Sequence, residues 1–361
     1  MRILHTEASL GWGGQEIRVL TEAQIFLKHG HEVFLVADSQ SQIARKAPNY
    51  GVKVIAININ KKRLGDLLAL RKVIKETKPD IINCHSSTDH WLSAIARLTL
   101  KLKPAIVRTR HISTHVHRNK PTKWLYNNGT DAIMTTGQSI RTQLLDGDFV
   151  NGKTIFSVPT GIDTDRFAPG DKLKQKMLLG LSPDHFVFGI VATLRSWKGH
   201  SDLIAAFNLL NNPKITLVIV GDGPQMGNCQ KLAKESLYPQ HISIVGEKSD
   251  VVPYLQAFDC FVLPSYANEG IPQALLQAMS VGLPIISCPI GGIPEAVNDY
   301  KQATLVPTQD PKELAKAMLK EVLEDGKSAK QERQTLYSLE RMYCSVLEVF
   351  NLAREKIINC R

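Results

Sequence analysis

Long hydrophobic runs, a leader pattern and internal repeats are all missing from this sequence of 361 residues. No apolar run approaches the roughly 18 residues that a membrane-spanning helix needs. The amino terminus, MRILHTEASLGWGG, has no signal-peptide pattern, because a short strand-like run leads straight into a glycine loop. No short-period repeat or low-complexity segment is present. We therefore expect a cytoplasmic protein of two domains, since the chain is more than twice the usual length of one domain.

Paired cysteine motifs are missing as well. The six cysteines are scattered and form no CxxC motif: Cys84, Cys229, Cys260, Cys288, Cys344 and Cys360. Most stand in apolar surroundings, as Cys260 does in DCFVLP, which is typical of buried thiols in a reducing compartment. The sequence predicts neither a zinc site nor any other metal site.

Carboxylates are missing from one stretch, between Trp91 and Thr130, in a chain of formal net charge +10. The cations that accumulate there are Arg97, Lys101, Lys103, Arg108, Arg110, Arg118, Lys120 and Lys123, with His111, His115 and His117 among them. A basic face over residues 97–123 suits a phosphorylated sugar, an anionic inner-membrane surface or a nucleic acid. No nucleic-acid motif accompanies it and few aromatic residues could stack on bases, so we expect no nucleic acid. A merely solvated basic face is the remaining alternative.

The first half of the chain alternates short apolar runs with helical patterns. Seven runs are expected to form strands: 2–6, 32–38, 52–57, 80–85, 105–110, 132–137 and 154–159. Apolar residues from Ile17 to Leu27 recur at helical spacing, and Gly30 suits the end of that helix. Further helices are expected at 64–76, 88–102 and 138–146. Apolar strands without alternation, joined by helices, indicate a parallel sheet covered on both faces.

A linker-like stretch at 159–172, rich in Pro, Gly and Asp, precedes a second series of the same kind. Strands are expected at 186–194, 215–221, 242–246, 259–265, 284–289 and 303–307, and helices at 199–210, 224–236, 251–257, 272–281 and 294–298. The end of the chain is helical. The pattern predicts two doubly wound α/β domains of similar size, with ligands bound at the carboxyl ends of the strands, in the cleft between the domains.

Two loops between a strand and a helix carry residues suited to an anion. SLGWGGQE brings Gly13 and Gly14 to a helix start, where free N–H groups attract anions, although a plain flexible turn looks similar. It lacks the G-x-G-x-x-G spacing of a dinucleotide fingerprint, which disfavours a nicotinamide-dependent dehydrogenase. TLRSWKGH places Arg195 and Lys198 beside a helix start, which suits a diphosphate. Two solvated surface cations are the alternative.

Two further loops have plainer interpretations. VGDGPQ, which contains Gly221, suits a structural turn, and Glu295 in PIGGIPEAV suits compensation of the helix dipole.

The stretch ANEGIPQALLQAMSVGLP has a single carboxylate, Glu269, directly before an expected helix. Pro272 suits the first turn of that helix and Gly282 suits its end. The free N–H groups of this helix start belong to Gly270, Ile271 and Gln273. Gln277 lies more than a turn into the helix, where it faces either a ligand or solvent.

In order and spacing, the motifs GWGGQE, PTGIDTDRF, VATLRSWKGH, VGDGP, PSYANEGIPQALLQAMSVGLPIIS and GGIPE resemble those of the retaining GT-B glycosyltransferases of family 4. The resemblance covers nearly the whole chain, and it is most specific over 264–295, where the family has a Glu-x7-Glu signature and a Gly-Gly-x-Pro-Glu loop. It implies an acceptor-side Rossmann-like domain of residues 1–165, to which a helix at about 340–361 returns, and a nucleotide-sugar-binding domain of residues 166–339. It also implies sugar transfer with retention, without a metal or other cofactor.

The same resemblance implies roles for individual residues. Glu269 would hold donor-sugar hydroxyls, and Lys198 would neutralise the diphosphate leaving group. His111 would lie near the acceptor and the donor sugar. The remaining donor-binding candidates are Gly13, Gly14, Gly221, Gly270, Ile271, Pro272, Gln273 and Gln277.

Three positions depart from the family pattern. Thr193 stands where the family has an arginine, and we expect Arg195 to replace that cation in the catalytic set. Thr160 replaces an asparagine of the linker motif. Gln277 replaces the second glutamate of the signature, which commonly accepts hydrogen bonds from the nucleotide ribose, so one carbonyl acceptor remains and the charge is lost. We expect altered nucleotide preference or a modest loss, and not loss of catalysis.

The sequence therefore predicts a glycosyltransferase that moves a sugar from a nucleotide-sugar donor to a glycan or lipid-linked acceptor, in lipopolysaccharide or surface-polysaccharide synthesis. Peripheral attachment to the inner membrane through the basic residues is a further expectation. Two alternatives stay open: a nucleotide-sugar epimerase of the same architecture, and a catalytically weak nucleotide-sugar-binding protein. The epimerase would normally need additional carboxylates in the cleft, and the sequence identifies none.

Overall fold

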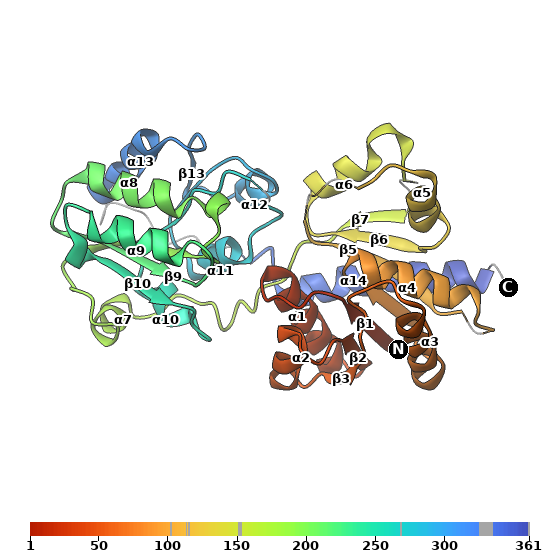
Figure 1. The fold of residues 1–361 in the computed structure, drawn as a ribbon. Helices are drawn as coiled ribbons and strands as arrows, with labels where there is room; N and C mark the ends of the chain where they lie inside the picture. Colours follow the sequence, from red (N-terminus) through yellow and green to blue (C-terminus); the bar gives the residue numbers. More distant parts are fainter. Residues whose placement is uncertain are drawn as a thin grey trace. The chain divides into compact units, whose positions relative to one another are not determined.

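The computed structural model describes residues 1–101, 103–112, 114, 116–150, 154–267, 269–324 and 335–359. His115 of the basic stretch and Cys360 lie outside the described residues. The chain forms two compact units, residues 1–161 with 337–361 and residues 162–336. They are called unit 1 and unit 2 below, and each is described by itself (Figure 1).

Unit 1 is built on a seven-stranded sheet in the order β3-β2-β1-β4-β5-β6-β7, whose paired strands all run parallel. The strands are β1 (Arg2–Glu7), β2 (Glu32–Ala37), β3 (Lys53–Ala56), β4 (Ile81–Cys84), β5 (Ala105–Arg110), β6 (Ala132–Thr135) and β7 (Ile155–Ser157). The helices before the linker are α1 (Gly14–Lys28), α2 (Gln42–Lys46), α3 (Leu64–Thr77), α4 (Ser87–Leu98), α5 (Lys120–Asn127) and α6 (Gln138–Leu145).

The strands β4, β5 and β6 of this sheet are buried along their length because helices cover both faces. Every residue of β4, β5 and β6 is buried, and no polar–apolar alternation remains in the burial pattern. Two apolar clusters result. One contains Phe26 of α1 and Phe350 near the chain end, and the other contains Leu70 of α3 and Leu92 of α4.

The final helix, α14 (Leu339–Asn359), returns to unit 1. It packs against α1, β5 and β6, and its apolar residues Val346, Val349 and Phe350 join the core cluster of α1 (Figure 1). The Gly161 N–H donates to Met342 Sδ at 3.1 Å, which ties the start of the linker to this helix. The predicted return of the last helix to the first domain is confirmed.

Unit 2 repeats the design with a six-stranded sheet in the order β10-β9-β8-β11-β12-β13, whose paired strands are again parallel. Its strands are β8 (Phe186–Val191), β9 (Ile215–Val220), β10 (Ile242–Gly246), β11 (Cys260–Leu263), β12 (Ile285–Ser287) and β13 (Ala303–Leu305). Its helices are α7 (Lys172–Leu178), α8 (His200–Leu210), α9 (Met226–Lys234), α10 (Val252–Ala257), α11 (Gln273–Val281), α12 (Ile293–Val297) and α13 (Pro311–Glu324). The predicted class, two doubly wound α/β sheets, is confirmed.

The structure corrects several local expectations. The linker was expected to extend to residue 172, but α7 starts there, with the Asp171 carboxylate capping it by accepting from the Lys174 N–H at 3.0 Å. The helices α2 and α5 were not expected. Each begins with a side-chain cap, Ser41 and Asn119 respectively. The helix expected at 88–102 ends at Leu98.

Candidate functional site

Three loops meet at the carboxyl ends of neighbouring strands in unit 2. They follow β8, β11 and β12, which are adjacent in the sheet. The loop after β8 carries Lys198, and the loop after β11 carries Glu269. The Lys198 Nζ and Glu269 Oε1 atoms form an ion pair at 2.6 Å, with the carboxylate buried and the lysine largely buried. The two residues predicted to carry the chemistry are thus brought together.

Glycines let these loops approach one another closely. Gly291, at φ +59°, lies so near the Glu269 carbonyl that an added Cβ would stand 2.1 Å from its oxygen. The Gly292 N–H donates to the Gly270 carbonyl at 3.0 Å, so the loop after β12 supports the loop that carries Glu269. Gly221, at φ +146°, is needed for its own packing, because a Cβ there would stand 2.0 Å from the Ala192 carbonyl oxygen. This favours the structural interpretation of Gly221.

The helix α11 begins directly after the Glu269 loop and has no side-chain cap at its amino end. Pro272 occupies the cap position in an extended conformation, instead of the first turn where it was expected. The N–H groups at such a helix start are unpaired and attract anions. Ile271 is buried, while Gln273 Oε1 has no hydrogen-bond partner among the described residues. Loop, helix start and ion pair thus lie together in an arrangement that would suit an anion.

Two predicted site residues of unit 2, Arg195 and Gln277, form no side-chain hydrogen bond or ion pair with the Lys198–Glu269 pair among the residues that the structure describes. Arg195 is exposed, with its guanidinium 5.6 Å from the centre of the Trp197 ring. Gln277 is half-buried on α11, and no hydrogen bond of its side chain is found within the described part of the chain. Their proposed roles, replacement of the missing arginine and contact with the ribose, stay predictions.

In unit 1, Gly13 and Gly14 stand at the start of α1, as predicted. An added Cβ at Gly14 would meet nothing within 4 Å, and one at Gly13 would make only an ordinary contact with Glu16. The fold of unit 1 itself therefore does not require glycine at either position. This leaves the space in front of the α1 start free for a close approach by another group.

His111 follows β5 and ends a chain of three hydrogen-bonded histidines. His5 Nδ1 lies 2.9 Å from His85 Nε2, and His85 Nδ1 lies 3.0 Å from His111 Nε2. Burial, followed by nearby positive charge, holds the pKa of His85 and of His111 well below the usual value, so both are neutral at pH 7. Each ring in the chain therefore fixes the tautomer of the next. His111 was predicted from the sequence, but His5, which lies within β1, and His85, which directly follows β4, were not.

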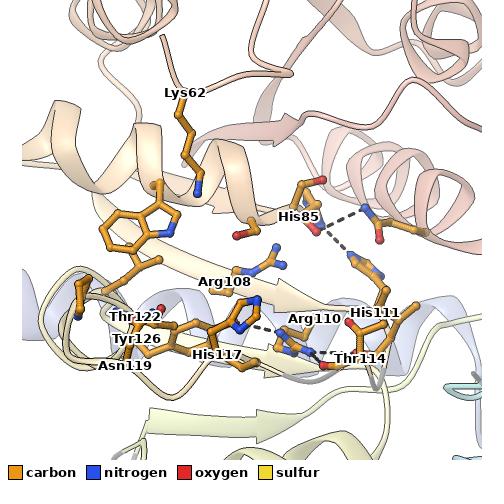
Figure 2. A pocket seen from close by; sticks show the side chains of 18 residues that line it. Lys62, His85, Arg108, Arg110, His111, Thr114, His117, Asn119, Thr122 and Tyr126 are labelled. Carbon is orange, nitrogen blue, oxygen red and sulfur yellow. Dashed lines mark hydrogen bonds between the residues drawn. The ribbon is translucent and has the colours of Figure 1, made fainter. Parts of the chain in front are cut away.

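His111 and His85 border a cavity of about 630 Å³ within unit 1. Its lining shares one property: many side chains are cationic or can donate a hydrogen bond, and none is a carboxylate. Figure 2 shows Lys62 and Arg108 extending into this space from opposite sides, with Arg110, His117 and Tyr126 along its floor. The polar residues of its lining are Gln15, Lys62, His85, Ser86, Ser87, Arg108, Arg110, His111, Thr114, His117, Asn119, Thr122 and Tyr126.

The basic stretch is therefore not one surface, which corrects the predicted basic face over residues 97–123. Arg97 is buried and paired with Asp131, and Arg108 and Arg110 are buried in β5. The exposed cations of the stretch are Lys101, Lys103, Arg118, Lys120 and Lys123. A signal for this split was present in the sequence, because AIVRTR places two arginines at alternate positions of a strand that is otherwise apolar or small.

Within the described residues, no three His, Cys, Asp or Glu side chains gather in a way that could hold a metal ion. The three histidines of the chain are no exception, since their facing nitrogens bond to one another.

Two family descriptions match the sequence. Glycosyltransferase Family 4 matches residues 12–166, and Glycosyl transferases group 1 matches residues 171–337. The chain therefore belongs to the group 1 glycosyltransferases of family 4, with the GT-B fold, as its motifs predicted.

Individual relatives support the same family. The chain is 32% identical over 250 residues to the UDP-Gal:alpha-D-GlcNAc-diphosphoundecaprenol alpha-1,3-galactosyltransferase of Escherichia coli, a match that covers 64% of this chain and 63% of that protein. It is 29% identical over 215 residues to the D-inositol 3-phosphate glycosyltransferase of Corynebacterium jeikeium, covering 56% and 51%. The matches thus span less than two thirds of the length of either relative.

Solved structures share the fold over almost the whole chain. A glycosyltransferase from Rickettsia africae superimposes with a TM-score of 0.85 at 19% identity, covering 98% of both chains. Anabaena HepE in complex with UDP-glucose superimposes with a TM-score of 0.84 at 18% identity, covering 97% of this chain and 99% of that chain. At these identities the likeness shows the fold alone.

Proposed function

We propose that the protein transfers a sugar from a nucleoside-diphosphate sugar to a glycan or lipid-linked acceptor, with retention of the anomeric configuration and without a metal ion. The observation that carries the proposal is the ion pair between Lys198 and Glu269 at the uncapped start of α11. One cation and several free N–H groups suit a diphosphate, while a buried carboxylate beside them suits sugar hydroxyls.

The proposed chemistry assigns the donor to unit 2. The bond from the anomeric carbon to the diphosphate oxygen breaks, and a bond from that carbon to an acceptor oxygen forms. The proton of the acceptor hydroxyl leaves with the nucleoside diphosphate, so no separate carboxylate base is needed. Lys198 and the α11 N–H groups stabilise the negative charge that grows on the diphosphate, which is where such a site gains rate. Glu269 accepts hydrogen bonds from the sugar and fixes its orientation.

Lys198 and Glu269 neutralise each other in their ion pair. Donor binding then replaces their mutual contact by two separate contacts, one to phosphate and one to sugar hydroxyls. A donor that carries both groups satisfies both side chains, whereas a bare phosphate or a free sugar satisfies one and leaves the other unpaired. This favours the complete nucleotide-sugar over its parts.

The acceptor belongs, in this proposal, to lipopolysaccharide or surface-polysaccharide synthesis. The E. coli relative acts on a sugar joined by a diphosphate to undecaprenol, which supports a lipid-linked acceptor. Work on the cytoplasmic side is supported by the unpaired cysteines of the described chain, of which Cys84, Cys229, Cys260 and Cys288 are buried thiols.

Peripheral contact with an anionic membrane is part of the proposal. No helix in the described residues combines the length and apolar character needed to cross a bilayer. A second cavity of unit 1, about 620 Å³, lies between α3, the end of α4 and α14 and is lined by both cations and apolar side chains. Lys75, Lys101 and Lys103 border it, and the exposed Leu64, Leu98 and Ile358 lie on the same three helices or their ends. Sedimentation with anionic but not zwitterionic vesicles tests this contact, and equal sedimentation with both would contradict it.

The test of the main proposal is turnover of nucleotide-sugars by the purified protein. Thermal-shift screening against nucleotide-sugars identifies the donor, because a ligand of the native state raises apparent stability. Transfer to a glycan acceptor is then followed, and the anomeric configuration of the product is read by NMR. Lys198→Ala and Glu269→Ala should each lower transfer by about 10²–10³-fold without changing the circular dichroism spectrum.

The same assay separates the alternatives. An epimerase would isomerise the donor without an acceptor, and a binding protein would bind the donor without releasing nucleotide. Turnover like that of the wild-type protein in either purified variant would overturn the site assignment.

A further inference from the structure

Arg108 and Arg110 are buried cations that lack a carboxylate partner in the described part of the chain. Their exposed fractions are 6% and 7%, and neither forms an ion pair there. As alternate residues of β5 they leave the same face of the sheet, and both line the 630 Å³ cavity. Buried charges in proteins are normally paired, because an unpaired charge loses its hydration without compensation. The two arginines therefore point to a negatively charged group that comes from outside the chain.

Other buried cations of the molecule follow the ordinary rule. Arg18 pairs with Glu22 and Arg97 with Asp131 in unit 1, while Lys176 pairs with Asp259 in unit 2. The exception thus concerns the cavity and not the chain as a whole.

The hydrogen bonds of the two arginines hold them in place without neutralising them. Arg110 donates to the Tyr126 hydroxyl at 3.1 Å and to the carbonyls of Ile112 and Thr114. Arg108 donates from Nη1 to the carbonyls of Cys84 and Thr109. The Nε atoms of both have no partner among the described residues. Neutral acceptors orient a guanidinium, but they leave its full charge directed at the cavity.

The titration of neighbouring groups reports the same positive potential. Burial alone raises the pKa of Tyr126, yet Arg108 and Arg110 together bring it below its usual value. Arg108 also acts on the buried carboxylate of Asp89, which accepts from the Thr6 hydroxyl at 2.7 Å and from the Ser86 N–H at 2.9 Å. Burial and the adjacent Glu7 raise the pKa of Asp89 to about 7, so its compensation of Arg108 is incomplete at neutral pH.

We propose that this cavity binds the phosphate or diphosphate group of the acceptor, held by Arg108, Arg110 and Lys62. The inference rests on the proposed transferase function and names the substrate class of its acceptor. Three permanent cations match a diphosphate better than a single carboxylate or a neutral sugar. Hydrogen-bond donors at Asn119, Thr122 and His117 complete the polar lining.

The rest of the cavity has room for the sugar and the apolar group to which the phosphate is attached. Its volume of about 630 Å³ is several times that of a phosphate group and lies within the usual range for small-molecule sites. Trp91, Ile112 and Val116 give one part of the lining an apolar character, and Trp91 stacks on Trp124 with ring centres 6.2 Å apart. The neutral His111 is in reach as a hydrogen-bonding group for a sugar hydroxyl beside the phosphate.

A binding experiment with inorganic pyrophosphate tests the anion site directly. The full chain carrying Lys198→Ala is used, so that the donor site of unit 2 contributes little. Calorimetry should detect pyrophosphate binding that weakens with salt, and Arg110→Met should weaken it about 10- to 100-fold. Lys72→Gln is the matched control, since Lys72 is an exposed cation of unit 1 outside the cavity. Equal binding by Arg110→Met and Lys72→Gln would overturn the proposal.

If Arg110→Met does not fold, Arg110→Lys serves as the second variant, because it keeps the positive charge and changes only its geometry. That variant should retain part of the pyrophosphate affinity, and retention of none by a folded Arg110→Lys would count against recognition by charge. Folding of unit 1 in each variant is read from its circular dichroism spectrum and from its urea unfolding transition.

A kinetic experiment separates the sources of the phosphate. A water-soluble sugar 1-phosphate, a prenyl-diphosphate sugar in vesicles and the same sugar without phosphate are compared as acceptors. Both phosphorylated acceptors should have a KM about 10-fold or more below that of the neutral sugar, and Arg110→Lys should raise KM more than it lowers kcat. A lower KM for the vesicle-bound acceptor alone identifies a lipid diphosphate, and equal KM values for both identify the phosphate itself. A neutral sugar that serves equally well would overturn the inference.

Failure of the inference and failure of the proposed function are distinguishable. Pyrophosphate binding that depends on Arg110 supports the anion site even if no sugar transfer is found. Sugar transfer that is insensitive to acceptor phosphate leaves the transferase intact and removes the anion site.

Discussion

The candidate sites of the two units treat positive charge in opposite ways. In unit 2 the cation of the candidate site, Lys198, meets a carboxylate of its own chain at 2.6 Å. In unit 1 the cations that line the cavity, Arg108 and Arg110, meet carbonyl and hydroxyl oxygens but no carboxylate in the described chain. A ligand of the first site must separate a pair that already exists. A ligand of the second supplies the missing charge.

The difference fits two substrates of different chemistry. A donor that brings both a diphosphate and sugar hydroxyls replaces both halves of the Lys198–Glu269 pair. A cavity whose charged side chains are all cations is expected to favour an anion over a neutral sugar. Pairing within the chain, more than the number of cations, would then predict what kind of group each site takes.

The largest expected effect concerns a buried pair of unit 1 that serves the fold. Arg18 and Glu22 are fully buried on α1 and pair at 3.0 Å, and Asn83 donates to the same carboxylate at 2.9 Å. Glu22→Leu leaves Arg18 buried without a countercharge and should lower the free energy of unfolding by about 3–5 kcal/mol. Arg110→Leu leaves no carboxylate behind and should cost about 1–2 kcal/mol for its lost hydrogen bonds. Urea unfolding measures both.

The double variant Arg18→Met/Glu22→Leu is the control for this contrast. Removing both charges should recover most of the loss, because no unpaired charge remains in the core. If Arg110→Leu costs as much as Glu22→Leu, the cavity arginine is paired in a way that the comparison overlooks.

The second effect converts the paired site into an unpaired one. Glu269→Gln keeps the shape of the side chain but frees Lys198 from its countercharge. Sugar transfer should fall by about 10²-fold, because the sugar loses an ionised acceptor. The bare nucleoside diphosphate should instead bind up to about 10-fold tighter, since Lys198 no longer has to leave a carboxylate. Calorimetry and a transfer assay on the same preparation measure the two changes.

Glu269→Asp is the matched control, because it keeps the negative charge but moves the carboxylate away from Lys198 by one methylene group. A Glu269→Gln variant with unchanged or weaker nucleoside-diphosphate binding would show that the pair does not compete with the ligand.

Most of the fold follows from the periodicity of the sequence. Each of the thirteen strands lies within or close to a predicted run, because continuous apolar runs mark strands buried on both faces. The misses were short helices such as α5 and α7, which have few apolar residues and are identified by their caps instead. The unit boundaries, after residues 161 and 336, lie a few residues from the predicted ones, and the contacts of Gly161 with Met342 and Leu339 of the returning helix are not visible in composition.

The part of the candidate site that lies in loops with a recognisable motif could be predicted from the sequence. Lys198 and Glu269 come from loops far apart in the sequence, and the motif order brought both to attention. Their direct pairing could not be foreseen, since it depends on the approach of Gly291 to the Glu269 backbone. The burial of Arg108 in the cavity wall could not be predicted for a different reason. Counting charge along the chain cannot tell an exposed lysine from an arginine whose strand is buried on both faces.

The third expected effect is a change with pH in the free energy of unfolding, which is caused mainly by the buried histidines of unit 1. Burial lowers the pKa of five histidines of unit 1, namely His5, His31, His85, His90 and His111. Below pH 6.5 the unfolded chain binds protons that the folded chain does not, so stability falls as the pH falls. Asp89 acts in the opposite direction, because its pKa is raised to about 7 and the folded state gains a proton there; burial raises the pKa of Glu7 as well.

The histidines outnumber these two acids, and the free energy of unfolding should fall by about 2 kcal/mol from pH 6.5 to pH 5.5. Urea unfolding at both pH values measures the loss. Asp89→Asn removes one of the two opposing acids and should make this fall in the free energy of unfolding larger. A stability that rises over this interval in the wild-type protein would contradict the neutral, tautomer-fixed histidine chain.

The smallest effect concerns Gln277, which stands where the family signature has its second glutamate. Gln277 is half-buried on α11, one turn beyond the helix start that faces the Glu269 loop. If it accepts a hydrogen bond from the ribose, Gln277→Glu restores a second acceptor and a charge, and the nucleotide should bind about 3- to 10-fold tighter. Nucleotide affinity by calorimetry decides the point, with Gln256→Glu as the control because Gln256 lies on α10 and donates to the Ala168 carbonyl. An unchanged affinity would mean that the nucleotide is recognised without this position, and that unit 2 depends on Lys198, Glu269 and the α11 start alone among the residues considered.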